Sequence, residues 1–130
     1  MRSGECGVRN EKRLMKHNNL KERTKQFALR VIRLVESLPK GRTSEVIGRQ
    51  LLRSGTSVAA NYRAACRAKS TADFIFKMGI VEEEADESIF WMEILVDAKI
   101  VEKKLLLELM EEADELLAII VASIKTARKK

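Results

Sequence analysis

Apolar and small residues recur at alternating steps of three and four positions along four long segments of the chain. In the third segment the recurring residues are Phe74, Met78, Val81, Ala85, Ser88, Met92 and Leu95. This spacing places the side chains on one face of an α-helix, because a helix repeats every 3.6 residues. One Pro and 6 Gly in 130 residues leave too few turn signals for a β-sandwich or barrel. We therefore predict an all-α fold.

Residues that start and stop helices separate the four segments. The predicted helices cover about residues 20–38, 43–67, 71–98 and 102–127. Pro39 and Gly41 end the first helix, because Pro disfavours helix in the residue before it and Gly accepts the left-handed conformation. Thr43 or Ser44 is expected to cap the second helix with its hydroxyl. Ser70 is expected to cap the third, where an acid follows three residues later.

Helices of this length joined by short connections favour an antiparallel up-down four-helix bundle over residues 18–127. Residues 1–17 and 128–130 are rich in Lys and Arg and are expected to form basic tails. The charged N-terminal segment lacks the apolar centre of a signal peptide. The longest apolar run, residues 116–122, is far shorter than the ~20 residues that span a bilayer. We therefore expect a cytoplasmic protein without a membrane partner.

Charge is unevenly distributed along the chain, whose formal net charge is +6. Residues 1–69 contain 17 Lys and Arg against 5 acidic residues, whereas residues 70–130 contain 8 against 14. Such asymmetry favours either a basic surface for an anionic partner or basic and acidic helices that pack on each other. Both possibilities depend on where the arginines lie on the helix faces.

Arginines form a stripe along the second predicted helix. At 100° per residue, five side chains fall within about 80° of one another: Arg42, Arg49, Arg53, Arg63 and Arg67. Further cations on the first helix include Arg23, Arg30 and Arg33. Surplus cations on one half of a small domain are typical of phosphate-backbone binding, and the sequence contains no zinc-finger spacing or RNA-binding aromatic motif. We predict that these arginines bind RNA or DNA with little sequence specificity.

The alternative interpretation is a structural or protein-interaction bundle whose arginine stripe is consumed in contacts within or between subunits. The acidic partners would form one ridge on the third helix and are Glu82, Asp86, Glu93 and Asp97. In that case the stripe has no ligand.

Small polar residues lie between the arginine stripe and the apolar face of the second helix. This polar seam consists of Gln50, Ser54, Ser57 and Asn61. Because these side chains are short and uncharged, we expect them to be buried and to hydrogen-bond with carboxylates of the third helix such as Glu84. The other partner expected for Glu84 is an arginine. The polar seam is therefore predicted to be structural.

The third helix carries a second apolar face beside its core face. The residues of this face are Phe76, Ile80, Trp91 and Ile94. A helix of a monomeric four-helix bundle needs only one buried face, and an exposed patch with Phe and Trp is unusual on a monomer. We predict that these residues form an interface between copies of the chain.

The residue types present do not support catalytic or metal-binding chemistry. The only histidine, His17, precedes the bundle, so the chain lacks the Glu-x-x-His pairs of a di-iron bundle and the base that a serine nucleophile needs. Two cysteines and one histidine are also too few for a four-ligand zinc site. We predict a non-enzymatic protein without a metal or cofactor.

The stretch from Leu38 to Ser88 contains a specific set of motifs. Its sequence is LPKGRTSEVIGRQLLRSGTSVAANYRAACRAKSTADFIFKMGIVEEEADES. The motif residues are Gln50, Arg53, Ser54, Ser57 and Asn61 in one helix, Arg67 and Ser70 in the link, and Asp73, Phe74, Glu82 and Glu84 in the next helix. This pattern resembles the bacterial four-helix-bundle proteins first noticed in intervening sequences within large-subunit ribosomal RNA genes.

The resemblance implies an up-down bundle that assembles into a homopentamer with a central pore. It also implies similarity to the accessory variability determinant of diversity-generating retroelements, a basic pentamer that binds nucleic acid and the reverse transcriptase of the element. The leading hypothesis is therefore a non-enzymatic homo-oligomer that binds RNA or DNA through phosphates, with a reverse transcriptase as a further partner.

Overall fold

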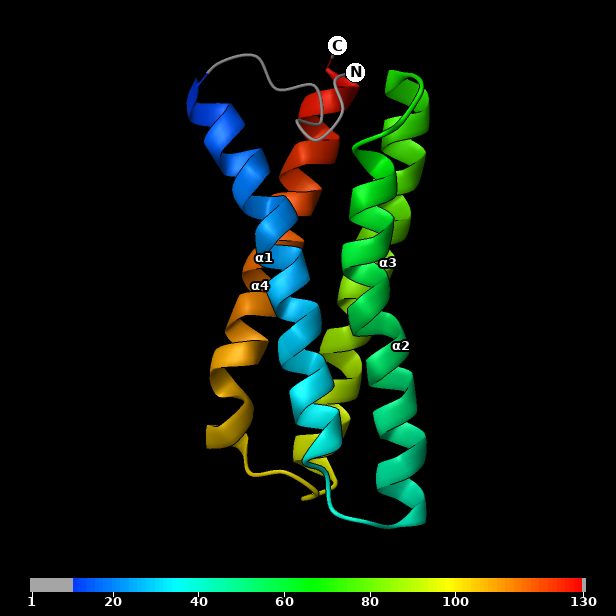
Figure 1. The fold of residues 1–130 in the computed structure, drawn as a ribbon, viewed down its shortest axis with the longest axis vertical. Coiled ribbons are helices and arrows are strands. Elements are labelled where there is room, and N and C mark those ends of the chain that lie inside the picture. The colour runs from blue at the N-terminus through cyan, green and yellow to red at the C-terminus, as the bar shows by residue number, and fades with distance from the viewer. Residues whose placement is uncertain (1–10, 130) are drawn as a thin grey trace.

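The structure of the chain, a computed structural model, describes the backbone of residues 11–129 and the side chains of residues 19–129. Its helices are α1 (Glu11–Glu36), α2 (Arg42–Ala65), α3 (Thr71–Asp97) and α4 (Lys103–Arg128) (Figure 1). The described residues contain no β-strand, and the predicted all-α, four-helix fold class is confirmed. Within the same residues, no helix has an apolar stretch long enough to cross a membrane.

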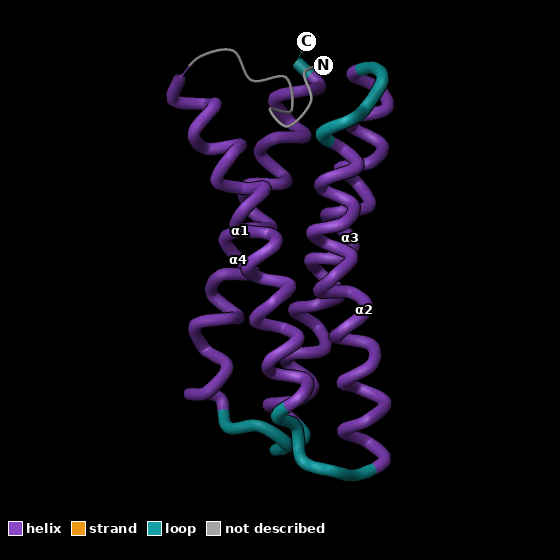
Figure 2. Tube along the Cα trace, in the orientation of Figure 1, coloured by secondary structure: helices purple, strands orange, loops and turns teal. Residues whose placement is uncertain are grey.

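The four helices lie along one long axis (Figure 1). Each helix runs opposite to the helix before it, so the α1–α2 and α3–α4 connections share one end of the molecule. The α2–α3 connection lies at the other end, together with the C-terminus of α4 (Figure 2). α2 packs against α1 and α3, whereas α4 packs against α3 and less extensively against α1. The second helix is therefore flanked on both sides and has one outward face.

α1 is longer at its N-terminal end than the sequence predicts. It begins at Glu11, whereas the prediction places a tail over residues 1–17 and the start of the helix near residue 20. Residues 11–17 consist of Glu, Lys, Arg, Leu, Met and His without Gly or Pro, so nothing in this segment stops a helix. The tail prediction is therefore wrong for residues 11–17. The rest of that tail, residues 1–10, lies outside the described residues.

The other helix boundaries lie within two residues of the predicted ones, which is the usual uncertainty of helix ends. Ser70 caps α3 as predicted, because its hydroxyl accepts a bond from the backbone N–H of Asp73 at 3.0 Å. The Asp73 carboxylate in turn accepts a bond from the backbone N–H of Lys69 at 3.0 Å. These two bonds fix the turn between α2 and α3.

The prediction for the cap of α2 is wrong. α2 begins at Arg42 directly after Gly41, and no side chain bonds to its N-terminal N–H groups. Gly41 has a φ of 153°, a conformation that glycine adopts more easily than other residues. The chain therefore enters the helix before Thr43 and Ser44 are reached, and both lie in its first turn.

The predicted core face of α3 is buried along its whole length. All seven residues are at most 5% exposed: Phe74, Met78, Val81, Ala85, Ser88, Met92 and Leu95. α2 contributes Leu51, Val58 and Tyr62, which are 0% exposed. Burial of a large apolar side chain is worth about 1.5–3 kcal/mol, so this core supplies the main driving force for folding.

Gly55 lets α1 and α2 approach closely. A Cβ atom at this position would lie 2.9 Å from both γ-carbons of Val31, a fully buried residue of α1. Carbon atoms in favourable contact are about 3.5–4.0 Å apart. A larger residue at position 55 would therefore push α1 and α2 apart.

Candidate nucleic-acid interface

The arginines of α2 lie on the side of the helix that points away from the core. The side that meets the core is buried and contains Ile47, Leu51, Val58 and Tyr62. All five arginines of the predicted stripe are exposed: Arg42, Arg49, Arg53 and Arg63 in α2, and Arg67 in the turn after it. The five share an exposed position but differ in their partners.

Arg53 is held by two carboxylates of α3. Its guanidinium donates to both oxygens of Glu84, at 3.1 and 3.2 Å, and to the carboxylate of Glu87. The Arg53 guanidinium lowers the pKa of Glu87, and the indole N–H of Trp91, which donates to the same carboxylate at 3.0 Å, lowers it further. The charge of Arg53 is neutralised within the chain, which makes this residue a poor candidate for a phosphate contact.

Arg49 forms a weaker ion pair, and three other arginines form none. The Nη2 atom of Arg49 lies 3.2 Å from Glu45 one turn earlier, and the two side chains are 67% and 73% exposed. Exposed pairs of this kind contribute about 0.3–0.5 kcal/mol, so this pair adds little to the stability of the bundle. Arg42, Arg63 and Arg67 contact no acidic side chain within residues 19–129.

Arg23 of α1 is bound by α4. Its guanidinium forms two bonds with Glu112, at 3.0 and 2.7 Å, and one with Glu115 at 2.9 Å. These carboxylates raise the pKa of Arg23, and only 22% of its side chain is exposed. Because two anionic partners already occupy the guanidinium, the structure does not favour the predicted phosphate contact of Arg23. Arg30, half-buried, and Arg33, exposed, have no acidic partner in the described part of the chain.

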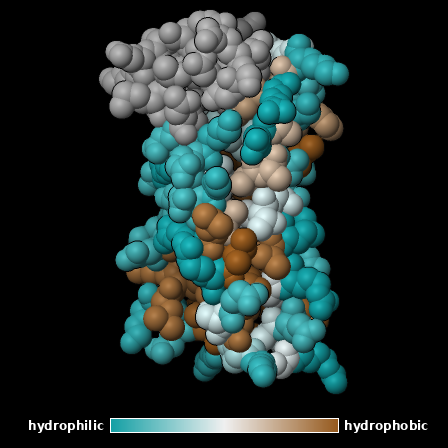
Figure 3. All heavy atoms as spheres, in the orientation of Figure 1, coloured by the Kyte–Doolittle hydropathy of each residue, from teal (hydrophilic) through white to brown (hydrophobic). Residues whose placement is uncertain are grey.

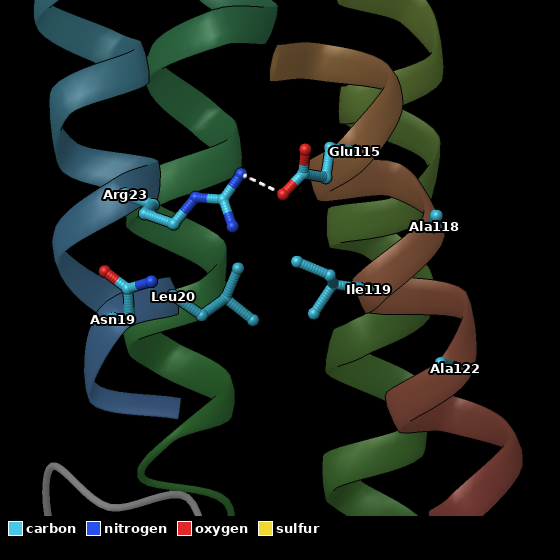
Figure 4. Close-up of a pocket in the computed structure, with 7 residues that line it drawn as sticks. All are labelled: Asn19, Leu20, Arg23, Glu115, Ala118, Ile119 and Ala122. Carbon is cyan, nitrogen blue, oxygen red and sulfur yellow. Dashed lines mark hydrogen bonds and ion pairs between the residues drawn. The ribbon is translucent and has the colours of Figure 1, made fainter. Parts of the chain in front are cut away.

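A cleft of about 440 Å³ lies beside this ion pair, between α1 and α4 (Figure 4). It is lined by Asn19, Leu20, Arg23, Glu115, Ala118, Ile119 and Ala122. Leu20 and Ile119 point toward each other across the cleft, and Arg23 bonds to Glu115 at its edge (Figure 4). These described lining residues include no nucleophile with a neighbouring base, and the two charged ones, Arg23 and Glu115, pair with each other.

The acidic ridge of α3 does not contact the arginine stripe within the chain. Across the described residues, none of the four ridge acids forms an ion pair: Glu82, Asp86, Glu93 and Asp97. Glu84 is the residue that reaches Arg53, and residues two positions apart on a helix lie about 200° apart, so Glu82 points to a different side. Within one chain the alternative interpretation therefore holds for Arg53, through Glu84 and Glu87 and not through the ridge, and for the ridge acids it concerns contacts between copies.

The polar seam uses a different partner from the predicted one. Ser54 and Ser88 are 0% exposed, and the Ser88 hydroxyl donates to the Ser54 hydroxyl at 3.0 Å. Ser54 in turn donates to the backbone carbonyl of Leu51 at 3.3 Å. The predicted bonds from the seam to the Glu84 carboxylate are absent from the described residues, because Arg53 occupies that carboxylate.

The remaining members of the seam are less buried than Ser54. Gln50, Ser57 and Asn61 are half-buried, and the Asn61 amide donates to the Ser57 carbonyl of its own helix at 2.9 Å. Only Ser54 therefore links α2 to α3 through the seam.

The four residues of the second apolar face of α3 lie in two different environments. Phe76 is 68% exposed and Ile80 is half-buried away from the core cluster, whereas Trp91 and Ile94 pack against the core. Phe90, which was not predicted from the sequence, is 48% exposed and meets Trp91 edge to face, with ring centroids 4.8 Å apart. The exposed apolar surface on α3 therefore consists mainly of the two phenylalanines.

Glu87 is a second residue that was not predicted from the sequence. It accepts bonds from Arg53 of α2 and from Trp91 of its own helix. Glu87 lies three residues after Glu84 and four before Trp91, so all three side chains lie on one side of the helix. This spacing is the sequence signal that could have revealed the cluster of Glu84, Glu87 and Trp91.

The fold and these contacts define a helical protein whose surface carries unneutralised arginines. Across the described residues, no group of three or more His, Cys, Asp or Glu side chains could hold a metal ion. The space-filling view shows hydrophilic residues interrupted by apolar ones on the face it presents (Figure 3).

The sequence model of the 23S rRNA-intervening sequence protein family matches residues 16–122, and the chain belongs to this family. The chain is also similar to a crystal structure of a protein of unknown function from the S23 ribosomal protein family of Bacteroides thetaiotaomicron, with a TM-score of 0.78 and 33% identity. The match covers 83% of this chain and 96% of that chain. No curated protein matches the chain. The resemblance to the intervening-sequence family is thereby confirmed, whereas the relation to retroelement accessory determinants stays a prediction.

Proposed function

We propose that this protein is a non-enzymatic homo-oligomer that binds RNA or DNA through the phosphate backbone. The observation that carries the proposal is that Arg42, Arg63 and Arg67 are exposed and have no acidic partner in residues 19–129. The chain has 19 acidic residues, and it uses some of them to neutralise Arg23 and Arg53. The arginines left over keep their full charge, and a planar guanidinium suits bidentate contacts with phosphate.

The family assignment supports an RNA-linked role, because the family takes its name from an intervening sequence of 23S rRNA. The described residues supply arginines in place of a groove with stacked aromatics, so binding should depend on charge and hardly on base sequence. Affinity should fall steeply as salt rises.

Anisotropy titrations of a labelled RNA and of a DNA of the same sequence at several salt concentrations test this proposal. The double variant Arg63→Gln with Arg67→Gln should weaken binding and lower the slope of log affinity against log salt by ~0.7–0.9 for each phosphate that is no longer neutralised. The matched control is Arg49→Gln with Lys104→Gln, which removes two exposed cations that already have acidic neighbours, Glu45 and Glu102. Absence of binding by the unaltered protein at low salt would leave the interaction bundle as the better account.

Assembly is proposed to use the exposed apolar surface of α3. A large aromatic side chain that is 68% exposed, as Phe76 is, costs free energy in water and is typical of an interface. Light scattering should give a mass several times 14.8 kDa, and the pentamer is the number implied by the family resemblance. Phe76→Glu should lower this mass, whereas Leu105→Glu on α4, at a residue that is 69% exposed, should leave it unchanged. A monomer at micromolar concentration contradicts the assembly.

The reverse transcriptase that the resemblance implies as a partner stays a prediction. The position of the gene distinguishes the forms of the proposal, since a gene next to a reverse transcriptase supports an accessory subunit. A gene inside a ribosomal RNA gene supports a role tied to the intervening sequence itself.

A further inference from the structure

One end of the molecule carries a large excess of positive charge. Residues 60–78, which close α2 and open α3, contain four Lys and Arg and one acid, and residues 120–129 of α4 contain three Lys and Arg and no acid. Both segments lie at the end that holds the α2–α3 connection (Figures 1 and 2). The single acid, Asp73, is already used, because it accepts bonds from the backbone of Lys69 and the ammonium of Lys77, each at 3.0 Å.

The other cations of this end are available to a ligand. They are exposed, make no ion pair within the described residues and form what we call the basic end: Arg63, Arg67, Lys69, Lys125, Arg128 and Lys129. They come from α2, the α2–α3 turn and α4, so three separate elements present charge to the same region of solvent.

The acidic residues of α3 disfavour a polyanion on their side of the bundle. Residues 79–96 of α3 contain six acids and no Lys or Arg, and would repel phosphates from the side of the molecule. At the opposite end, residues 36–49 and 97–104 together contain six Lys and Arg and four acids. The opposite end is therefore close to balanced, and its Arg49 and Lys104 have acidic neighbours.

Stabilisation of the helices explains the presence of only some of the cations in the basic end. Cations near helix C-termini interact favourably with the helix dipole, which accounts for Arg63 at the end of α2 and for Lys125 and Arg128 at the end of α4. It also accounts for Arg67, which directly follows the C-cap of α2, but not for Lys69. Lys69 lies just before the N-cap of α3, where the dipole is positive and cations are disfavoured.

We infer that nucleic acid docks on the basic end of the bundle and not along the length of α2. Phosphates contact Arg67 and Lys69 in the turn together with the cations at the ends of α2 and α4, while Arg42 at the opposite end makes no contact. This inference rests on the proposed function and selects which of the exposed arginines carry it out.

Two double variants with the same change in charge test the inference. Arg67→Gln with Lys125→Gln removes one Arg and one Lys from the basic end, and Arg42→Gln with Lys103→Gln removes one of each from the opposite end. All four side chains are exposed and unpaired within residues 19–129, so both variants should fold, which circular dichroism melting checks. The probe is a labelled single-stranded RNA of mixed sequence titrated at several salt concentrations.

The basic-end variant should bind the RNA about 10- to 30-fold more weakly at 0.1 M salt, because each neutralised phosphate is worth roughly fivefold there, and its salt slope should fall by about 0.7 per phosphate. The opposite-end variant should stay within about twofold of the unaltered protein. The charge-preserving variant Arg67→Lys with Lys125→Arg should retain binding, which shows that charge is responsible.

Equal losses of affinity in the two double variants, or a loss only in the opposite-end variant, would overturn the inference and leave the proposed function standing. A loss in the charge-preserving variant as large as in the basic-end variant would overturn it as well. Absence of binding by the unaltered protein at low salt is a different outcome, because it removes the proposed function and this inference together.

Discussion

Gly55→Ala tests the close approach of α1 and α2 that positions the cations of both helices. The added Cβ would lie 2.9 Å from Cγ1 and from Cγ2 of Val31 and 3.1 Å from its Cβ, which is about 0.5–1 Å inside a favourable carbon contact. Val31 is 0% exposed, and a valine in a helix has one strongly preferred rotamer. Rotation of the side chain cannot relieve the contact, since both γ-carbons meet the new atom. We expect α1 to be displaced.

Two opposing effects determine the change in the free energy of unfolding of Gly55→Ala. Overpacking of a well-packed core costs ~1–3 kcal/mol, whereas replacing a helical Gly by Ala stabilises the helix by ~0.8–1 kcal/mol. Gly79→Ala in α3 is the matched control, because a Cβ there meets no described atom of another helix within 4 Å. The control should therefore gain most of the helix stabilisation. The difference between the two variants isolates the packing cost and should be ~1–3 kcal/mol.

Urea denaturation followed by circular dichroism gives the free energy of unfolding of each variant by linear extrapolation. All proteins are compared at one concentration, because assembly adds to the apparent stability. Adding Val31→Ala to Gly55→Ala should recover part of the stability, which a double-mutant cycle measures as a favourable coupling. If Gly55→Ala proves as stable as Gly79→Ala, the close approach of α1 and α2 is refuted.

Polar contacts between helices also contribute to the stability of the bundle. Arg53 lowers the pKa of Glu87 in the folded protein, so the ionised Glu87 carboxylate stabilises the fold. This stabilisation is fully present above the pKa of Glu in the unfolded chain, about 4.3, and is lost as pH falls through the lower pKa of folded Glu87. In Arg53→Gln, the free energy of unfolding measured from about pH 7 to pH 2 should therefore fall less steeply at acid pH than in the unaltered protein. An unchanged pH dependence would contradict the pairing. Ser54→Ala should destabilise by ~1 kcal/mol, whereas Ser57→Ala, at a half-buried hydroxyl, should be close to neutral in thermal melts. Arg23→Gln should cost ~1–2 kcal/mol in urea denaturation because it leaves two carboxylates of α4 without their partner, and a change below ~0.5 kcal/mol would mean that solvent replaces the ion pair.

Local sequence was sufficient to predict the helices and the core. The α3 face from Phe74 to Leu95 is buried at every predicted position, because alternating steps of three and four are a property of one helix and need no partner to be recognised. The Ser70 cap was also predictable, since its bond spans only three residues. Predictions failed where a signal was weak or absent. Residues 11–17 contain no helix stop, and Gly41 starts α2 earlier than the expected hydroxyl caps.

The tertiary structure decided the partners of those charged and polar side chains that bond to a different helix. Helix-wheel angles place Arg53 in the same stripe as Arg63, yet of these two only Arg53 pairs with carboxylates. The reason is that Glu84 and Glu87 of α3 lie at the same level along the bundle axis as Arg53. Which residues of two neighbouring helices lie at the same level depends on the axial register of one helix against the other. That register is set by packing between elements such as Gly55 against Val31, and periodicity within a single helix does not contain it. The sequence by itself thus determined which faces are apolar and which are basic, and the packing of α1, α2, α3 and α4 determined which arginines have no acidic partner among residues 19–129.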